Sequence, residues 1–253
     1  MKPFHRFSTQ VLLRRVAALA FVGLLFAHAL GAPVPEPEPD DLADAAPPPV
    51  SDPFIRFNRA MFDVNDWLYR NGVQPVSRGY EKTVPRPLRR GLDNFFNNLR
   101  FPVRFVGSVL QAKFGRATRE TGRFLANTTI GIAGFVRVSD RIPVLAPEPT
   151  EDIGQALGSW GIGPGPFLVL PVLGPSDARD LLGRVGDAFL TPTAWRFDYY
   201  REWEVRLAVQ SVDAVQSTPE LLRNYDAFRA NALDPYLAVR NAYLANREAE
   251  IRR

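Results

Sequence analysis

The sequence contains no cysteine, and its two histidines, His5 and His28, both fall within the first 32 of its 253 residues. The rest of the chain therefore lacks the thiol and imidazole groups that serve most often as nucleophiles, general bases and metal ligands. Thiolate catalysis, Ser-His-Asp triads, disulfide frameworks and nearly all zinc and haem sites are excluded there. We expect no metal, no cofactor and no catalytic residue, and we predict that the protein is not an enzyme.

Lysine is also scarce, because only Lys82 and Lys113 follow residue 32. The formal net charge of +4 arises in residues 1–32, which carry four basic side chains and no acidic one. Residues 33–253 then balance 27 basic against 27 acidic groups. A nucleic-acid-binding protein usually carries a strongly basic surface. We therefore expect no nucleic-acid partner.

The N-terminus has the order of parts of an export signal. A basic stretch ends in Arg14 and Arg15, an apolar run follows from Val16 to Ala29, and Ala27-His28-Ala29 offers a cleavage site. The run is shorter than the roughly 20 residues that span a bilayer. We predict that residues 1–32 are a cleaved signal peptide, with an uncleaved membrane helix as the alternative.

The next stretch, residues 33–51, is rich in proline and acidic residues and has no basic side chain. Such a composition buries too little apolar surface to fold, and its prolines stiffen the chain. We predict a disordered tether here, either a plain spacer or an arm that holds the body away from a surface. Residues 52–253 remain as one domain with a core of its own.

Apolar residues recur at helical spacing along this domain. The pattern predicts a first helix that has Asp52 as its N-cap and Pro53 in its first turn, and that ends near Asn71-Gly72. Further helices are expected in residues 86–99, 103–114, 115–136, 177–190, 193–215, 219–230 and 235–251. The uncharged end of the fourth helix, residues 124–136, enters either the core or a bilayer. Seven or eight helices with little sheet predict a mainly α fold.

Residues 153–176 carry no charge, six glycines and four prolines. Each proline removes a backbone donor and clashes with the preceding turn, so a continuous helix is excluded. We expect irregular apolar backbone, with residues 167–170 as a short strand-like run. In a membrane such backbone persists only when it is packed in protein or lines a wet cavity. The segment therefore predicts the wall of a pore or pocket.

Three groups of side chains leave two interpretations open. Buried amides either bond to neighbouring elements or line a polar lumen; the candidates are Asn58, Asn65, Asn94 and Asn98. Aromatic residues either pack in the core or face a membrane; these are Phe54, Phe57, Phe95, Phe96, Phe101 and Phe105. Arginines that could bind phosphate headgroups are Arg59, Arg104 and Arg123.

A carboxylate-based hydrolase is the enzymatic alternative. Four acids, Asp140, Glu148, Glu151 and Asp152, cluster in one predicted loop. A solvated acidic loop explains this cluster more simply than a catalytic pair.

Several motifs in residues 52–245 together resemble the MlaA (VacJ) family. The first is Asp52-Pro53-Phe54-x-x-Phe57-Asn58-Arg59-x-Met61-Phe62. It is followed in order by Gly91-Leu92-x-Asn94-Phe95-x-x-Asn98-Leu99, by Leu157-Gly158-x-x-Gly161-x-Gly163-x-Gly165-Pro166 and by Asp234-Pro235-Tyr236-x-x-Val239-Arg240. Several motifs that occur in the same order as in the family are not explained by chance.

The resemblance implies a compact, disc-like helical protein seated in the inner leaflet of the Gram-negative outer membrane, enclosing an amphipathic channel. The protein would sit beside a trimeric porin, and mislocalised outer-leaflet phospholipid would pass through the channel to a periplasmic carrier of the MlaC type. This transport would maintain lipid asymmetry. A soluble periplasmic lipid-binding protein that does not insert in the membrane is the alternative. Family members are typically anchored through an acylated cysteine. Leu30-Gly31-Ala32 stand at that place here, so we expect no lipid anchor.

The leading candidate for the channel wall is residues 160–167, because glycines let a lipid approach the backbone closely. Core packing is the alternative for the same residues. The full set of channel candidates is Asn58, Asn65, Trp160, Gly161, Gly163, Gly165, Pro166, Phe167 and Leu168. The candidates for the membrane rim are Phe95, Phe96, Phe101 and Phe105.

Overall fold

The computed structural model describes residues 52–192 and 232–253. These residues are mainly helical with one small hairpin, which confirms the predicted fold class. The predicted signal peptide and tether, and the helices expected in residues 193–215 and 219–230, lie outside the described residues. The α-helices are α2 (Ile55–Leu68), α3 (Gln74–Thr83), α4 (Arg86–Leu99), α5 (Phe101–Leu110), α6 (Phe114–Thr129), α7 (Ile153–Ser159), α8 (Ala178–Leu190) and α11 (Pro235–Arg252).

Helices α2 and α3 form one continuous rod, so the break predicted at Asn71-Gly72 is wrong. A π-helical turn, Tyr69–Val73, joins the two helices. Tyr69 and Val73 are buried, with Leu68 and Val172 packed against them. Burial of these side chains outweighs the turn preference of the Asn-Gly pair, and the wider π turn accommodates Pro75, which has no N–H.

The predicted N-cap of the first helix is also wrong. Helix α2 begins at Ile55, and no side chain caps it. The Asp52 carboxylate instead accepts hydrogen bonds from Asn58 Nδ2 at 2.8 Å and from the Tyr236 hydroxyl. Asp52 thus ties the start of the domain to its last helix. The Asp234-Pro235 start of α11 does have the predicted form, because the Asp234 side chain accepts from the Leu237 N–H.

Helix α6 ends seven residues earlier than predicted, at Thr129. The backbone then turns, with the N–H of Gly134 donating to Asn127 O at 2.8 Å and φ near +54° at both Ile132 and Ala133. A Cβ at Gly131 would lie 2.1 Å from a carbonyl oxygen, so only glycine fits this turn. Two short 3-10 helices, Val138–Arg141 and Pro143–Leu145, follow.

Residues 153–176 are more regular than predicted. They begin with α7 and end in a hairpin of β1 (Phe167–Leu170) and β2 (Gly174–Asp177), paired antiparallel from Phe167 opposite Asp177 to Leu170 opposite Gly174. The strand-like run predicted at residues 167–170 is confirmed as β1. Only the stretch between α7 and β1 is irregular.

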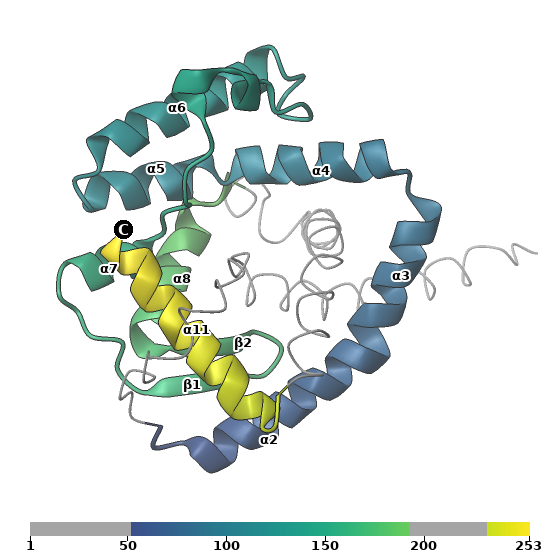
Figure 1. Cartoon of the computed structure of the whole chain (residues 1–253), viewed down its shortest axis with the longest axis vertical. Coiled ribbons are helices and arrows are strands. Elements are labelled where there is room, and N and C mark those ends of the chain that lie inside the picture. Colours follow the sequence, from purple (N-terminus) through teal and green to yellow (C-terminus); the bar gives the residue numbers. More distant parts are fainter. Residues whose placement is uncertain (1–51, 193–231) are drawn as a thin grey trace, which may run out of the picture.

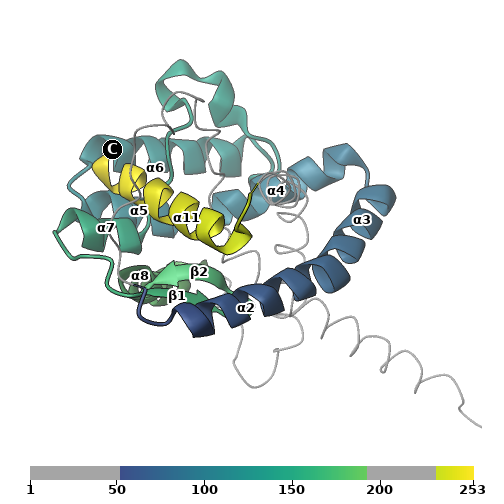
Figure 2. The same ribbon diagram turned by 60° about the horizontal axis from the view of Figure 1, so that its bottom comes forward.

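Helices α2 to α6 follow the edge of the molecule (Figure 1). The α2–α3 rod runs along the bottom and right of the view, α4 turns across the top, and α5 and α6 lie together beyond α4. Helix α11, in yellow, lies across β2 and α7 (Figure 2). None of the helices within the described ranges is both long and apolar enough to cross a membrane.

Polar residues dominate the interior of the described part. Nine apolar residues are buried there, against sixteen polar or charged ones, whereas twenty-one large apolar side chains are exposed. A domain surrounded by water normally buries its large apolar residues and leaves charges outside. The described surface is therefore unusually apolar, as expected of a protein in contact with lipid or with a partner.

Candidate functional site

The amide side chains of α2 hold the β-hairpin. Asn58 Nδ2 donates to Phe167 O at 3.0 Å, and Asn58 Oδ1 accepts from the Val169 N–H at 2.8 Å. Asn65 repeats the pattern, with bonds to Leu170 O at 2.9 Å and from the Val172 N–H at 2.7 Å. These carboxamides satisfy backbone groups of β1 and of the hairpin turn that follows it.

This pairing decides between the two interpretations of the α2 amides. Every hydrogen-bonding atom of the Asn58 carboxamide has a protein partner, and the residue is fully buried. Asn58 and Asn65 are therefore supports of the hairpin, and the prediction that they line a lipid channel is not retained. On α4, Asn94 and Asn98 likewise bond to Phe135 O and Thr128 Oγ1.

Phe167 lies in the core. It is fully buried in a cluster with Val169, Tyr236 and Leu244. This burial fits the core-packing alternative for Phe167, because strand alternation turns Phe167 and Val169 inward. Leu168 is on the opposite face of β1 and is only partly buried.

The segment before β1 is open. Trp160 is 56% exposed, and its indole N–H donates to Leu110 O at the end of α5. Gly161 and Gly165 have φ of +85° and +70°, which requires glycine, and a Cβ at Gly161 or Gly163 would meet nothing within 4 Å. The structure thus leaves space beside this backbone, where a ligand can come close.

The predicted rim residues divide into three groups. Phe105 and Val109 share one face of α5 and are each 36% exposed. Phe101 stacks on Phe124 with 4.5 Å between ring centroids. Phe95 packs on Phe96, which is 6% exposed, and this burial fits the core-packing alternative for Phe96. Adjacent residues of a helix point about 100° apart, which places the two rings differently.

The arginines proposed to meet headgroups are bound within the fold. Arg104 is buried and donates to Glu120 at 2.6 Å and to Asn97 O at 2.7 Å. Burial lowers the pKa of Arg104, an effect that the Glu120 carboxylate opposes. Arg59 pairs with Asp234 at 2.7 Å, and Arg123 pairs with Asp140 at 3.0 Å.

The acids of the predicted acidic loop are held in ion pairs and hydrogen bonds. Glu151 is 3% exposed and accepts from Lys113 at 2.9 Å and Gln111 at 2.6 Å. Glu148 pairs with Arg119 at 2.6 Å. Glu148 and Glu151 share Arg116 as a cation, whereas Asp140 pairs with Arg123 and Asp152 with Arg247. The loop is largely exposed, as predicted, but its acids are bound in ion pairs that hold it to the helices.

Sequence reasoning missed a buried charge cluster where α7, α8 and α11 meet. The Arg247 guanidinium bonds Asp152 at 2.8 Å and Asp180 at 3.0 Å, and the Tyr243 hydroxyl also donates to Asp180. Asp187, whose carboxylate accepts from the Ile153 N–H at 3.1 Å, is next to this cluster. Burial, assisted by the negative charge of Asp152, raises the pKa of Asp187 to about 7. The partners are too distant in sequence to be found from spacing.

Apolar side chains on exposed helix faces were missed as well. Leu182, Val185 and Phe189 share one exposed face of α8, at helical spacing. After α6, Ile130 and Ile132 are 68% and 72% exposed. The sequence signal for this face is the three- and four-residue spacing of its large apolar residues. Such spacing predicts an apolar helix face but does not show what covers that face.

The family follows from a comparison with known proteins. The model of the MlaA lipoprotein family matches residues 50–250 of this chain. The chain belongs to the MlaA lipoprotein family. It is 32% identical over 195 residues to the Escherichia coli intermembrane phospholipid transport system lipoprotein MlaA, covering 76% of this chain and 75% of the relative.

Two further similarities agree with this assignment. An uncharacterised protein of Rickettsia bellii is 30% identical over 203 residues, covering 80% of this chain and 77% of that protein. A solved structure from work on the structural basis for maintenance of bacterial outer membrane lipid asymmetry has a TM-score of 0.67 and 31% identity, covering 79% of this chain and 99% of that chain. The MlaA family consists of transport lipoproteins and not of enzymes, as predicted from the missing catalytic side chains.

Proposed function

We propose that this protein carries mislocalised outer-leaflet phospholipid through the outer membrane of a Gram-negative cell to a periplasmic carrier of the MlaC type, and so maintains lipid asymmetry. The observation that carries the proposal is the match of residues 50–250 to the MlaA family. The Escherichia coli relative is named for intermembrane phospholipid transport. A position beside a trimeric porin belongs to the same proposal.

The distribution of apolar side chains supports a place in the membrane. The described part exposes large apolar side chains on α2, α5, α8 and the turn after α6 while it buries charged ones. In a membrane, lipid tails would cover these apolar side chains, which avoids the free-energy cost of exposing them to water. Phe101 and Phe105 of α5 remain candidates for the rim, together with Phe95.

The open stretch before β1 supports a path for lipid. Trp160, Gly161, Gly163, Gly165, Pro166 and Leu168 remain the proposed wall. Glycine backbone offers polar N–H and carbonyl groups to a headgroup, and the neighbouring Trp160 and Ile162, both exposed, offer apolar contact to acyl chains. The free energy for transfer would come from binding of the lipid by the carrier, since the chain has no catalytic equipment.

The route to the membrane is part of the proposal. Residues 1–32 would direct export and be removed, and residues 33–51 would tether a single helical domain of residues 52–253. The domain would sit at the periplasmic face, in the inner leaflet.

The test is envelope fractionation of a Gram-negative host that expresses the full chain. Membranes are washed with carbonate, and mass spectrometry identifies the processed N-terminus and any copurified phospholipid. We expect the chain, cut near Ala29 or Ala32, in the outer-membrane fraction with phospholipid bound. Lipid-free protein found wholly in the soluble periplasm would contradict the proposal. Soluble protein with bound lipid would instead establish the non-inserting lipid-binding alternative.

A further inference from the structure

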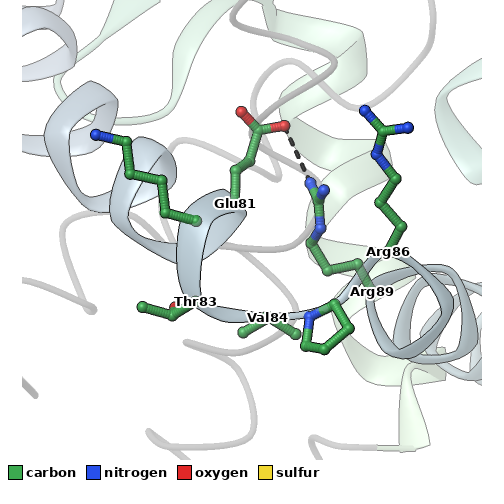
Figure 3. A pocket seen from close by; sticks show the side chains of 7 residues that line it. Glu81, Thr83, Val84, Arg86 and Arg89 are labelled. Carbon is green, nitrogen blue, oxygen red and sulfur yellow. Dashed lines mark hydrogen bonds and ion pairs between the residues drawn. The ribbon is translucent and has the colours of Figure 1, made fainter.

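A pocket of about 440 Å³ lies at the corner where α3 ends and α4 begins. Its lining is predominantly polar and comes from a single stretch of chain (Figure 3): Glu81, Lys82, Thr83, Val84, Pro85, Arg86 and Arg89. Three cations and one carboxylate give the lining a net formal charge of +2. A concave surface with this charge attracts anions.

The cations of this pocket are not all neutralised by the protein. Glu81, the only acid among the described lining residues, accepts from Arg89 Nη1 at 3.0 Å. Lys82 and Arg86 are exposed and form no ion pair within the described structure. The Arg89 Nε–H is buried and has no hydrogen-bond partner among the described residues. A buried donor without an acceptor is rare in proteins and indicates a missing partner.

The start of α4 adds to the positive charge. The N-terminal end of a helix carries a partial positive charge, which proteins usually offset with an acid or a side-chain cap. Helix α4 has neither, because Pro85 is its N-cap and its first turn has no acidic residue. Instead Arg86 and Arg89 extend to the same side of the turn (Figure 3). The start of α4 thus adds positive potential on the side where an anion would bind.

Apolar groups belong to the same site. Val84 and Pro85 contribute to the lining. A free inorganic anion would make no use of these groups. An amphipathic ligand would place its phosphate among the cations and its acyl chain against the apolar side chains.

We infer that the pocket between α3 and α4 binds the phosphodiester of an anionic phospholipid headgroup. The net charge of +2 favours a headgroup with a single negative charge over a zwitterionic one, because Lys82 and Arg86 repel an ammonium group. The site is separate from the proposed wall at residues 160–168. The proposed headgroup site does not depend on transport, because a protein that binds lipid without transporting it would still have this site.

The test is calorimetric titration of the detergent-purified full chain with dihexanoyl phosphatidylglycerol, dihexanoyl phosphatidylcholine and inorganic phosphate. We expect phosphatidylglycerol to bind at least about tenfold more tightly than the other two. The double variant Lys82→Gln/Arg86→Gln should weaken its binding at least about tenfold, whereas Lys82→Arg/Arg86→Lys should keep it within about threefold.

A matched control removes the same charge elsewhere. Arg56 and Arg141 are exposed and form no ion pair in the described ranges, so Arg56→Gln/Arg141→Gln should change binding less than about twofold. Equal loss of phosphatidylglycerol binding in the two glutamine double variants would contradict the proposed site. Equal affinity for phosphatidylglycerol and phosphatidylcholine would also contradict it. Inorganic phosphate that binds as tightly as phosphatidylglycerol would overturn the lipid assignment. Each result is independent of where the chain resides or whether it conducts lipid.

Discussion

Asn58 and Phe167 lie 109 residues apart, and the carboxamide of one binds the backbone carbonyl of the other inside the protein. The same carboxamide accepts from the N–H of Val169, so it spans two residues of β1 as a neighbouring strand would. This bond fixes the hairpin on α2. It also fixes the start of β1, to which the open segment of residues 160–166 is attached.

Replacing Asn58 with alanine should destabilise the fold. The change leaves a buried carbonyl and a buried N–H of β1 without partners, so we expect the free energy of unfolding to fall by about 2–4 kcal/mol. Urea unfolding followed by circular dichroism measures the loss. Asn71→Ala is the matched control, because Asn71 is exposed and bonds only Trp67 O of its own helical rod; it should cost under about 0.5 kcal/mol.

Arg247 should be essential for docking α11. Burial alone raises the pKa of Asp180, but the hydrogen bonds from Arg247 hold that pKa below its usual range. Arg247→Leu leaves three carboxylates, Asp152, Asp180 and Glu250, without their shared cation and should cost about 3–5 kcal/mol in the same unfolding measurement. Arg252→Leu removes an exposed pair with Glu248 and should cost under about 0.5 kcal/mol. Equal effects of the two substitutions would refute this role.

Stability should decrease with pH because of Asp187. Its pKa near 7 lies above the usual value of 3.8, so the folded chain holds a proton that the unfolded chain releases between about pH 4 and 7. The free energy of unfolding should therefore fall as pH rises through this window, by at most about 4 kcal/mol. Burial of the Asp187 carboxyl is the main cause of its raised pKa.

The variant Asp187→Asn tests this sign. Its amide oxygen can still accept from the Ile153 N–H, and it carries no charge at any pH. At pH 8 the variant should be more stable than the unmodified chain. Asp63→Asn removes the same charge from an exposed position of α2 and serves as the comparison. A pH profile for Asp187→Asn that matches the unmodified chain would contradict the prediction.

We expect Ile132 to lower the free energy of unfolding in water and to increase retention of the chain by membranes. It is 72% exposed and has φ of +54°, a conformation that a β-branched residue tolerates poorly. Ile132→Asn should raise the free energy of unfolding by about 0.5–1 kcal/mol and lower retention by carbonate-washed membranes. Ala112→Asn relieves a similar φ of +56° at an exposed small residue and should leave retention unchanged. Unchanged retention of Ile132→Asn would remove this residue from the membrane contact.

Local patterns were sufficient to predict much of the fold. Helices in residues 86–99, 177–190 and 235–251 were found from apolar spacing, and the Asp234 cap from its place before Pro235, because these signals act within one turn. The break expected at Asn71-Gly72 failed because burial of Tyr69 and Val73 decides that region. The family was recognised from the order of its motifs, and the match over residues 50–250 confirms it.

The candidate site was less predictable. Whether a buried amide lines a lumen or holds a strand depends on what lies across from it, and the partner of Asn58 is in a distant segment. The same limit applies to Arg104, whose partner Glu120 is on the next helix, and to Phe95 and Phe96, which the sequence treats alike. Contact between distant residues is set by packing, which composition and spacing do not encode locally.

The most direct test of phospholipid transport is the amount of phosphatidylethanolamine in the outer leaflet. A Gram-negative strain that lacks its own MlaA family protein is labelled with a membrane-impermeant amine reagent, with and without the full chain. We expect the chain to lower labelled phosphatidylethanolamine to the level of the strain with its own protein. Undiminished labelling, with the chain folded in the outer membrane and its lipid bound, would contradict it.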